Sequence, residues 1–358
     1  MKKLTAMILM IVMTISLMAC SNKEEPKTES PAETQEPEST PQQEPEESQG
    51  SNGLEGLVFG YSKHSITDPW HQAEVNSIQE AADQLGCKIV LTDAQGSTEQ
   101  QVSDIEDLIA QDVDFLIVSP GTTEGYDAVY EKAKEKNIPI MQIDRQTTVK
   151  EDGQSLIATV VSNHYQQGFD CGQWLVDHTA DYDKVNVVEI QGSIGGSDVE
   201  LRTQGFADAI QDAENIEIVA MQTGEWSRNT AQQVMQNLIQ SLGDGFQVVY
   251  AQNDTMALGA IAALKASGYT IGWDAFEKKE GVLVLTIDGQ TEAVESMLQG
   301  NINFIAACSP DYSGIFDIIA SWYNGETPEP LSYTPDYHFL QENVEAEGLE
   351  HAYDYGVN

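Results

Sequence analysis

From residue 57 to residue 143, short apolar stretches alternate with longer segments in which apolar residues recur at helical spacing. Strands are predicted at 57–62, 88–91, 115–118 and 138–143, and helices at 70–86, 99–110 and 126–136. Strands that alternate with helices through short connections predict parallel βαβ units and a doubly wound sheet. The alternation therefore predicts an α/β fold.

A second series of the same kind follows a polar connection near residues 147–154. Its strands are predicted at 156–161, 185–190, 216–221, 246–251 and 282–287, and its helices at 165–178, 199–212, 230–242 and 255–266. Two such halves that meet at their strand ends would form a cleft, and ligands bind at the carboxyl ends of strands in open α/β sheets. The segment 269–280 is expected to be an extra surface loop.

Polar side chains stand at the ends of several predicted strands. Asp144 and Arg145 follow the strand at 138–143, and the whole chain has only three arginines. Other strands end near Ser62, Asn253 and Asp288. Taken alone, Asp144 and Arg145 fit either a ligand site or a structural ion pair at the edge of the sheet.

The first 20 residues are predicted to be a signal peptide rather than part of the fold. Two lysines precede an apolar stretch at 4–18, and Leu17-Met-Ala-Cys20 stands at the position of a cleavage site. Small residues before a cysteine resemble the lipobox of bacterial lipoproteins, which implies cleavage before Cys20 and attachment of lipid to its sulfur. An ordinary secretory signal with a chance cysteine is the alternative.

Residues 21–52 are rich in Pro, Glu, Gln, Ser and Thr and have no large apolar side chain. Such a segment cannot bury enough apolar surface to offset its ordering entropy. We therefore expect a disordered, self-repelling stalk between the anchor and a folded module at 53–358.

The formal net charge of -41 excludes one class of partner. Nucleic-acid binding needs clustered Lys and Arg, so no nucleic acid is expected. The cysteines beyond Cys20 are widely spaced and are interpreted as buried small hydrophobic residues: Cys87, Cys171 and Cys308. The histidines are scattered without ligand spacing, so neither a metal nor a cofactor is expected: His64, His71, His164, His178, His338 and His351.

Several motifs, taken in chain order, resemble one family. They are Ser62 followed by Thr67-Asp-Pro-Trp-His71, then Ile143-Asp-Arg-Gln146, then Leu201-Arg202 ahead of Gly205-Phe206, then the segment 251–260 around Asn253, then Ile287-Asp-Gly289. This order is similar to that of substrate-binding proteins of sugar ABC transporters, which have the type 1 periplasmic-binding fold. The similarity covers about residues 57–323 and is strongest to the ribose-binding and galactofuranose-binding branches.

The resemblance implies two doubly wound parallel-sheet domains joined by a hinge, with the ligand in the cleft between them. It implies a first lobe at about 54–160 plus about 306–330, and a second lobe at about 161–305 plus a C-terminal crossover. It further implies an extracytoplasmic, lipid-anchored monomer that closes on a monosaccharide, a pentose or hexose in pyranose or furanose form. The partner would be an ABC transporter permease, and a sugar-sensing subunit of a membrane signalling kinase is the alternative.

The expected sugar-binding residues are Ser62, Asp68, Trp70, His71, Asp144, Arg145, Arg202, Trp226, Asn253 and Asp288. Carboxylate and guanidinium groups engage adjacent sugar hydroxyls in bidentate fashion, and rigid aromatic rings pack against sugar C–H faces. Simpler structural roles exist for some of these residues. Trp70 could belong to the core, and Asn253 could cap the helix that follows it.

Two departures from the family bear on the identity of the sugar. His71 stands where the ribose branch has a second aromatic residue and the galactofuranose branch an arginine. Ala307 and Cys308 lie where the ribose branch has a hydrogen-bonding glutamine. We therefore expect a monosaccharide without committing to ribose.

An anchored glycosidase is the enzymatic alternative, and it needs two carboxyl groups of which one has a raised pKa. Asp144 and Asp288 are the candidates in this chain. Beside arginines both are expected to stay ionised, which removes the general acid. No catalytic residue and no enzymatic activity are therefore expected.

Overall fold

The structure is a computed structural model that describes residues 53–335, 337–347 and 349–353. The predicted signal peptide with Cys20 and the predicted stalk at 21–52 lie outside the described residues. The described residues belong to one compact unit. Within them, no helix is both long and apolar enough to cross a membrane.

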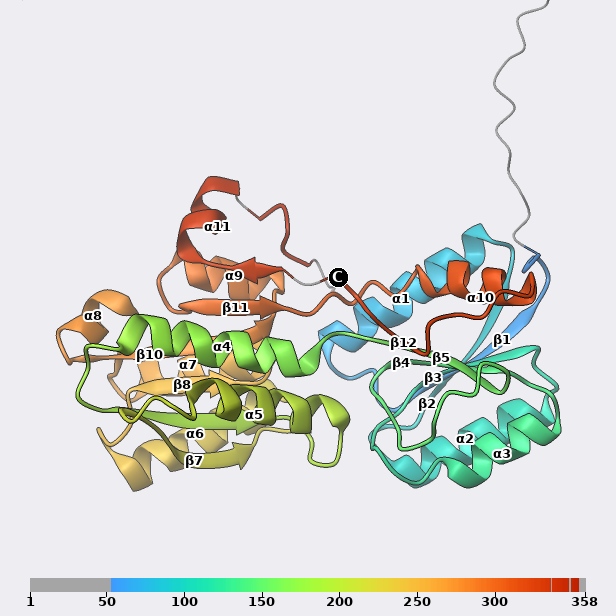
Figure 1. Cartoon of the computed structure of the whole chain (residues 1–358). Coiled ribbons are helices and arrows are strands. Elements are labelled where there is room, and N and C mark those ends of the chain that lie inside the picture. The colour runs from blue at the N-terminus through green and yellow to red at the C-terminus, as the bar shows by residue number, and fades with distance from the viewer. Residues whose placement is uncertain (1–52, 336, 348, 354–358) are drawn as a thin grey trace, which may run out of the picture. The chain divides into compact units, whose positions relative to one another are not determined.

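The first sheet has the strand order β12-β5-β4-β3-β1-β2, and its strands run parallel. Its strands are β1 (Val58–Lys63), β2 (Lys88–Asp93), β3 (Phe115–Ser119), β4 (Ile140–Asp144), β5 (Leu156–Val161) and β12 (Leu331–Tyr333). Its flanking helices are α1 (Pro69–Gln84), α2 (Thr98–Ala110), α3 (Asp127–Glu135) and α10 (Ile315–Tyr323). Helices α1 and α10 cover one face of this sheet, and α2 and α3 cover the other (Figure 1). We call this sheet with its helices the first lobe.

The second sheet has the order β13-β11-β10-β8-β6-β7, with β9 beside β10. Its strands are β6 (Val185–Gln191), β7 (Ile216–Thr223), β8 (Val248–Ala251), β9 (Thr270–Ile271), β10 (Gly281–Asp288), β11 (Phe304–Ala307) and β13 (His338–Phe339). Its helices are α4 (His164–Thr179), α5 (Ser197–Ile210), α6 (Arg228–Leu242), α7 (Asp254–Ala266), α8 (Trp273–Glu277), α9 (Thr291–Leu298) and α11 (Gln341–Glu347). All pairings are parallel except that of β13 with β11. We call this sheet with its helices the second lobe.

Side chains of one strand supply both faces of a sheet, because successive residues point to opposite sides. In β10, Leu283 and Leu285 join the core beneath α4 and α5, whereas Val282 and Val284 join the core beneath α6 and α7. All four are buried. Such strands therefore read as nearly continuous apolar runs rather than as alternating ones.

The chain passes between the lobes after β5, after β11 and after β12. Hydrogen bonds tie these three connections together, because Ser162 Oγ lies 2.8 Å from Thr334 Oγ1 and 3.3 Å from Cys308 Sγ. Strand β12 of the first sheet lies just beyond residue 330, near which the first lobe was expected to end. The chain then returns to the second lobe in β13 and α11.

The segment 269–280 is not the plain surface loop that the sequence predicted. It contains β9, which pairs with β10, and α8, whose Phe276 is buried in the core. A two-residue strand and a five-residue helix are too short to show a hydrophobic period. The strand predicted at 138–143 begins only at Ile140, directly after Pro139, which has no N–H to donate.

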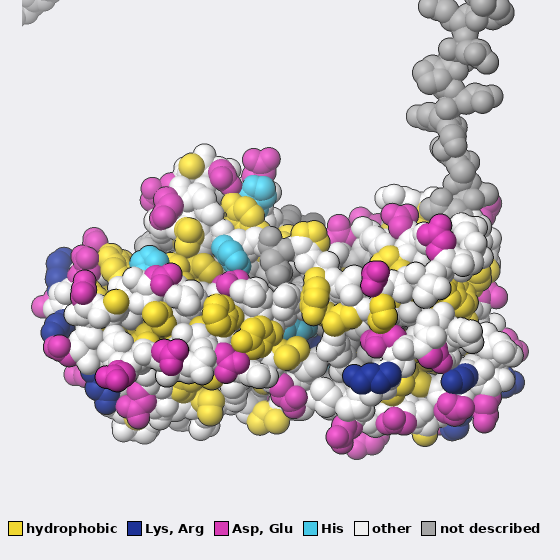
Figure 2. Space-filling view, in the orientation of Figure 1, with side chains coloured by type: hydrophobic (Ala, Val, Ile, Leu, Met, Phe, Trp, Pro, Cys, Tyr) yellow, Lys and Arg dark blue, Asp and Glu magenta, His cyan; other side chains and the backbone are white. Residues whose placement is uncertain are grey.

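Acidic side chains are spread over the face of the molecule seen in Figure 2, and Lys and Arg side chains are few. The distribution agrees with 58 acidic against 17 basic residues in the whole chain. Arg228 is the first residue of α6 and is exposed. This surface repels polyanions.

Candidate functional site

A narrow cavity lies where the carboxyl ends of strands from both lobes meet. It is lined by Asp68, Trp70, His71, Asp144, Arg145, His164, Asp198, Arg202, Trp226, Asn253, Asp288 and Cys308. The space between the lining atoms is about 310 Å³, of which about 20 Å³ can hold the centre of a water-sized sphere. That is room for about one water molecule, so the two lobes must part slightly to admit a sugar ring.

All but one of the expected site residues line this cavity, and the exception is Ser62. Ser62 is fully buried in β1, where its hydroxyl has no hydrogen-bond partner among the described residues. Lys63, the next residue, sends its ammonium group toward Asp144 and donates to Ser119 Oγ at 2.8 Å. Because neighbouring residues of a strand point to opposite faces, only one of the two can reach the site.

Asp144 ends β4 and presents an ionised carboxylate to the cavity. Its Oδ2 accepts from Ser119 Oγ at 3.0 Å and lies 3.5 Å from Lys63 Nζ and 3.7 Å from Arg145 Nε. Burial alone would raise the pKa of Asp144, but the charges of Arg145 and Lys63 outweigh it and hold the pKa below its ordinary value. Its φ of 67° is a left-handed conformation, and such backbone strain clusters at functional sites.

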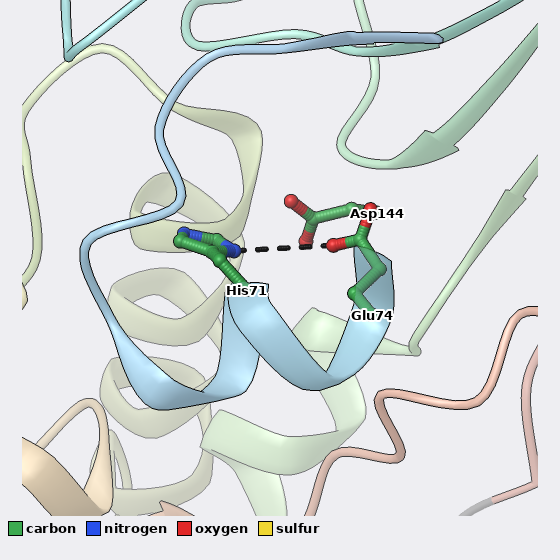
Figure 3. A group of neighbouring side chains, drawn as sticks. All are labelled: His71, Glu74 and Asp144. Atoms are coloured by element: carbon green, nitrogen blue, oxygen red, sulfur yellow. Dashed lines mark ion pairs between the residues drawn. The ribbon is translucent and has the colours of Figure 1, made fainter. Parts of the chain in front are cut away.

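Three possible metal ligands lie close together: His71, Glu74 and Asp144 (Figure 3). His71 Nδ1 lies 3.9 Å from Glu74 Oε2. The Lys63 ammonium group contacts the Glu74 carboxylate and also approaches Asp144, so it already supplies a positive charge between the two acids. A metal ion would have to displace that ammonium group, and the arrangement favours a buried ion-pair network.

Arg145 joins the two lobes beside the cavity. Its Nε donates to Oδ2 of Asp198 at 2.8 Å, and Asp198 belongs to α5 of the second lobe. The neighbouring Gln146 N–H donates to Ser197 Oγ at 2.9 Å. Burial would raise the pKa of Asp198, but the Arg145 charge holds it below its ordinary value. A direct ion pair therefore stabilises contact between the lobes at the site itself.

Arg202 is held rigidly by α4 and by the end of β8. Its Nε and Nη2 donate to Gln167 Oε1 at 3.1 and 3.0 Å, and its Nη1 donates to the Gln252 carbonyl at 2.8 Å. Its Nη2 also lies 3.8 Å from Asp288 Oδ1. These bonds fix the guanidinium plane in the cavity wall.

Asp288 differs from the expectation that it stays ionised. Burial raises its pKa well above the ordinary value, and the nearby Arg202 charge only partly offsets that effect. Its φ of 123° is unusual for a residue other than glycine. The cavity therefore pairs a carboxylate at Asp144 with a carboxyl group at Asp288 that holds its proton more firmly.

Two tryptophans form walls of the cavity. Trp70 belongs to the hydrophobic core and also lines the cavity, and its Nε1 donates to the Cys308 carbonyl at 2.7 Å. The ring centre of Trp226 lies 6.0 Å from Arg145 Cζ and 5.8 Å from Arg202 Cζ, within the range of cation–π attraction. A Cβ on Gly192 would come within 1.9 Å of the Trp226 ring, so this ring position requires glycine there.

Asp68 and Asn253 each cap a helix and also line the cavity. Asp68 Oδ1 accepts from the Trp70 N–H at 2.8 Å, and Asn253 Oδ1 accepts from the Met256 N–H at 2.9 Å. In each case one side-chain oxygen serves the helix. The second polar atom of each side chain remains available to a ligand.

Four buried polar atoms of cavity-lining residues have no hydrogen-bond partner in the part of the chain that the structure describes. They are Asp68 Oδ2, His71 Nδ1, His164 Nδ1 and Asp198 Oδ1. Leaving such an atom unpaired costs about 1–3 kcal/mol, so a ligand with several hydroxyl groups would relieve several costs at once. Burial and the Arg202 charge lower the pKa of His164 to about 4, so its ring is neutral at pH 7.

His164 and Asp198 line the cavity, and Lys63 approaches the Asp144 carboxylate; none of the three was expected at the site from the sequence. Lys63 is a lysine inside an apolar strand, and this position indicates a functional or paired residue because buried lysines need partners. His164 and Asp198 lie at the starts of α4 and α5, just ahead of where those helices were predicted to begin. Their position in strand-to-helix connections could have indicated a role at the site, because binding residues are common in such loops.

Residues 59–315 match the periplasmic binding protein domain. The chain belongs to the periplasmic binding proteins. The galactofuranose-binding protein YtfQ of Escherichia coli (strain K12) is 32% identical over 295 residues, which cover 81% of this chain and 90% of that protein. The ribose import binding protein RbsB of Bacillus subtilis (strain 168) is 29% identical over 266 residues, covering 74% of this chain and 80% of that one.

A solved structure in this family shares the fold. The periplasmic binding protein component of the arabinose ABC transporter from Shewanella sp. ANA-3, bound to α- and β-L-arabinofuranose, has a TM-score of 0.75 at 29% identity. The match covers 83% of this chain and 99% of that chain. The predicted family and the α/β fold with parallel sheets are thus confirmed. These relatives are named as binding proteins rather than as enzymes, and proteins of this family are extracytoplasmic.

Proposed function

We propose that this periplasmic binding protein captures a neutral monosaccharide in the cavity and delivers it to an ABC transporter permease. One observation carries the proposal: the Asp144 carboxylate, the Arg145 and Arg202 guanidinium groups and the Trp226 ring converge on one cavity from both lobes. Charge-assisted bonds from such groups suit vicinal hydroxyls, and an aromatic wall suits sugar C–H faces. The ten residues expected from the sequence, less Ser62, are the proposed contacts.

The furanose form of a pentose or hexose is the favoured ligand. One of the similar proteins is named as a galactofuranose-binding protein, and the structure of another contains bound L-arabinofuranose. The inner cavity is narrow, and its lining has unpaired acceptors on several sides. A compact ring with outward hydroxyls fits that distribution.

Binding proceeds by closure of the two lobes. Because the contacts come from both lobes, the ligand binds the closed form more tightly and shifts the population toward it. The two lobes of this proposal are the two sheets with their helices, and the three connections near Ser162, Cys308 and Thr334 act as the hinge. The closed form of this monomer is what the permease recognises.

Attachment to the membrane through Cys20 belongs to the same proposal. The lipobox-like sequence supports a position of the module at the outer surface of the cell membrane. A receptor subunit for a signalling kinase would use the same cavity. Stimulation of ATP hydrolysis by a reconstituted permease would favour the transporter over the receptor.

Native mass spectrometry tests the proposal with D-galactose, L-arabinose, D-ribose and D-fructose as probes. The wild type should form a 1:1 complex with at least one of them, and Asp144→Asn should lose most of it. Glu200→Gln, an exposed change on α5, serves as the control and should bind as the wild type does. Absence of any complex, or equal binding by Asp144→Asn, would contradict the proposal.

One observation favours a second candidate, an anchored glycosidase. Asp144 has a lowered pKa and Asp288 a raised one within a single cavity, which is the pattern of a nucleophile with a general acid. We nevertheless infer binding without catalysis, because relatives on this fold are named as binding proteins. Release of nitrophenol from nitrophenyl galactofuranoside or arabinofuranoside, lost in Asp288→Asn, would support the enzyme instead.

A further inference from the structure

A wider pocket adjoins the narrow cavity and plays no part in the function proposed above. Measured as the space open to the centre of a water-sized sphere, it has about 660 Å³, against about 20 Å³ for the cavity. We call it the outer pocket. Its walls include Pro69 at the start of α1, Gln290 ahead of α9, and Tyr353 near the C-terminus.

The outer pocket and the cavity share two wall residues, Asp68 and Trp226. Trp226 is only half-buried, so its ring is accessible beyond the cavity. Glu225 and Trp226 have φ values of 54° and 57°, two successive left-handed residues that hold the ring at this boundary. A ligand seated in the cavity could therefore continue past these two side chains into the outer pocket.

Two buried side chains in the walls of the outer pocket each have a buried polar atom without a hydrogen-bond partner among the described residues. Gln290 is 6% exposed and its Nε2 has no hydrogen-bond partner among the described residues. Asp68 is 7% exposed and its Oδ2 likewise lacks a partner. Both atoms are themselves buried, and a rotation of either side chain would present one donor or one acceptor to a polar ligand in the pocket.

The charges around the outer pocket select against anions. Arg228 is engaged by Glu292 through two hydrogen bonds, of 3.0 Å from Nη1 to Oε1 and 2.6 Å from Nη2 to Oε2. Glu225 and Glu295 add further negative charge. Acceptors therefore predominate, and the fitting ligand is neutral and rich in hydroxyl groups. The half-buried Trp226 side chain adds aromatic surface for sugar C–H faces.

We propose that the outer pocket is a second sugar subsite and that the ligand is a neutral disaccharide, with one unit in the cavity and the other between Trp226 and Gln290. This rests on the proposed sugar-binding function and extends it, because the cavity that takes a monosaccharide would also take one unit of a short glycoside. The glycosidic bond would pass between Asp68 and Trp226. Uronic acids and sugar phosphates are excluded by charge.

The test is capture by the immobilised protein from a pooled partial acid hydrolysate of arabinogalactan and inulin, which supplies monosaccharides, disaccharides and longer chains together. Mass spectrometry of the eluted sugars measures which lengths are retained. We expect the wild type to retain disaccharides at least tenfold more strongly than monosaccharides. Retention of monosaccharides alone would overturn the inference while leaving the proposed function intact, whereas retention of nothing would refute the proposed function itself.

Variants test whether the outer pocket is responsible for the retention of disaccharides. Gln290→Leu removes the unpaired amide of the outer pocket. Glu295→Lys puts a long cation on the exposed rim of that pocket. Each variant should lower disaccharide retention about tenfold and leave monosaccharide retention unchanged. Glu280→Lys makes the same charge change on an exposed residue outside the outer pocket and should change neither. If Gln290→Leu fails to fold, the surface variant Glu295→Lys still tests the second subsite. Disaccharide retention that survives in Glu295→Lys would contradict the second subsite.

Discussion

At the scale of single residues, the site depends on side chains that are buried and yet incompletely paired. Asp144, Arg145 and Arg202 are each at most 5% exposed and are held by neutral or charged partners from the protein. Such partners fix the orientation of a binding group before a ligand arrives, which reduces the entropy cost of binding. Trp226 differs, since it is half-buried and is held by its backbone and by two guanidinium groups.

Trp226→Ala should therefore weaken sugar binding much more than it weakens the fold. Loss of a packed aromatic face costs roughly 0.5–1.5 kcal/mol beyond its buried area, so the dissociation constant should rise about tenfold. Trp226→Phe keeps a ring over Arg145 and Arg202 and should recover most of the affinity. Titration calorimetry with the sugar found by mass spectrometry measures both. Equal affinity in wild type and Trp226→Ala would remove Trp226 from the site.

A buried carboxyl beside the cavity should make stability depend on pH. Asp254 Oδ2 accepts from the Gly289 N–H at 2.7 Å and the Gln290 N–H at 2.8 Å. Burial raises the pKa of Asp254 from 3.8 to about 7, and these two N–H groups only partly offset that rise. Between about pH 4 and pH 7 the unfolded chain has released this proton while the folded chain keeps it, so this group lowers stability as the pH rises through that range.

Asp254→Asn keeps the acceptor oxygen and removes the titration. The melting temperature of the wild type, relative to that of Asp254→Asn, should fall as the pH rises from 4 to 7 and level off above 7. The free energy involved is about 1.4 kcal/mol for each unit that separates the folded and unfolded pKa values. Melting curves at several pH values measure it. A constant difference between the two proteins would show that Asp254 has an ordinary pKa.

At the scale of elements, the loop before α5 joins the second lobe to the first. The Thr123 N–H donates to the Gly195 carbonyl at 3.0 Å, next to the contacts of Ser197 and Asp198 with the end of β4. These contacts form only when the lobes are together. In the proposed closure, the loop before α5 therefore helps to set how much of the protein is closed before sugar binds.

Asp198→Asn should shift the protein toward the open form, because it removes the negative charge that faces Arg145. Charge-assisted hydrogen bonds contribute about 1.5–3 kcal/mol, so sugar affinity should fall about tenfold or more. The radius of gyration from X-ray scattering, measured without sugar, should be larger than that of the wild type. Glu200→Gln, two residues further along α5 and exposed, is the matched control. Unchanged radius and affinity would show that the ion pair does not affect closure.

The arrangement of elements explains how much the sequence could predict. Asp144, Arg145, Asn253 and Asp288 were recognisable because parallel strands bring their carboxyl ends to one edge of a sheet. Ser62 was expected at the site and does not line the cavity, because an apolar strand with both faces buried does not show which residue faces which side. Contacts across the lobes, such as that of Asp198 with Arg145, depend on tertiary placement that no local period encodes.

At the scale of the whole molecule, the described fold and the proposed lipid anchor are separate in the sequence. The described core begins at Leu54, which is fully buried, and the segment that carries Cys20 precedes it in the sequence. The cavity and the proposed site of membrane attachment therefore lie in different parts of the chain. Changes in one part should leave the other unaffected.

Cys20→Ala should release the protein from the membrane fraction and leave sugar affinity unchanged. Loss of the sulfur removes the site of lipid attachment, and stable anchoring needs more than one acyl chain. Ser21→Ala, which keeps the cysteine, is the control and should remain in the membrane fraction. Fractionation with immunoblotting measures both variants. A Cys20→Ala protein that stays with the membrane would favour another mode of attachment.

The central claim is that one sugar is held by side chains from both lobes at once. The most direct measurement is titration calorimetry of wild type, Asp144→Asn and Asp288→Asn with the sugar that the wild type binds, since these two residues end β4 of the first lobe and β10 of the second. Both variants should bind at least about tenfold more weakly than the wild type, the loss expected for one hydrogen bond to a charged or buried group. Wild-type affinity in either variant would contradict the claim.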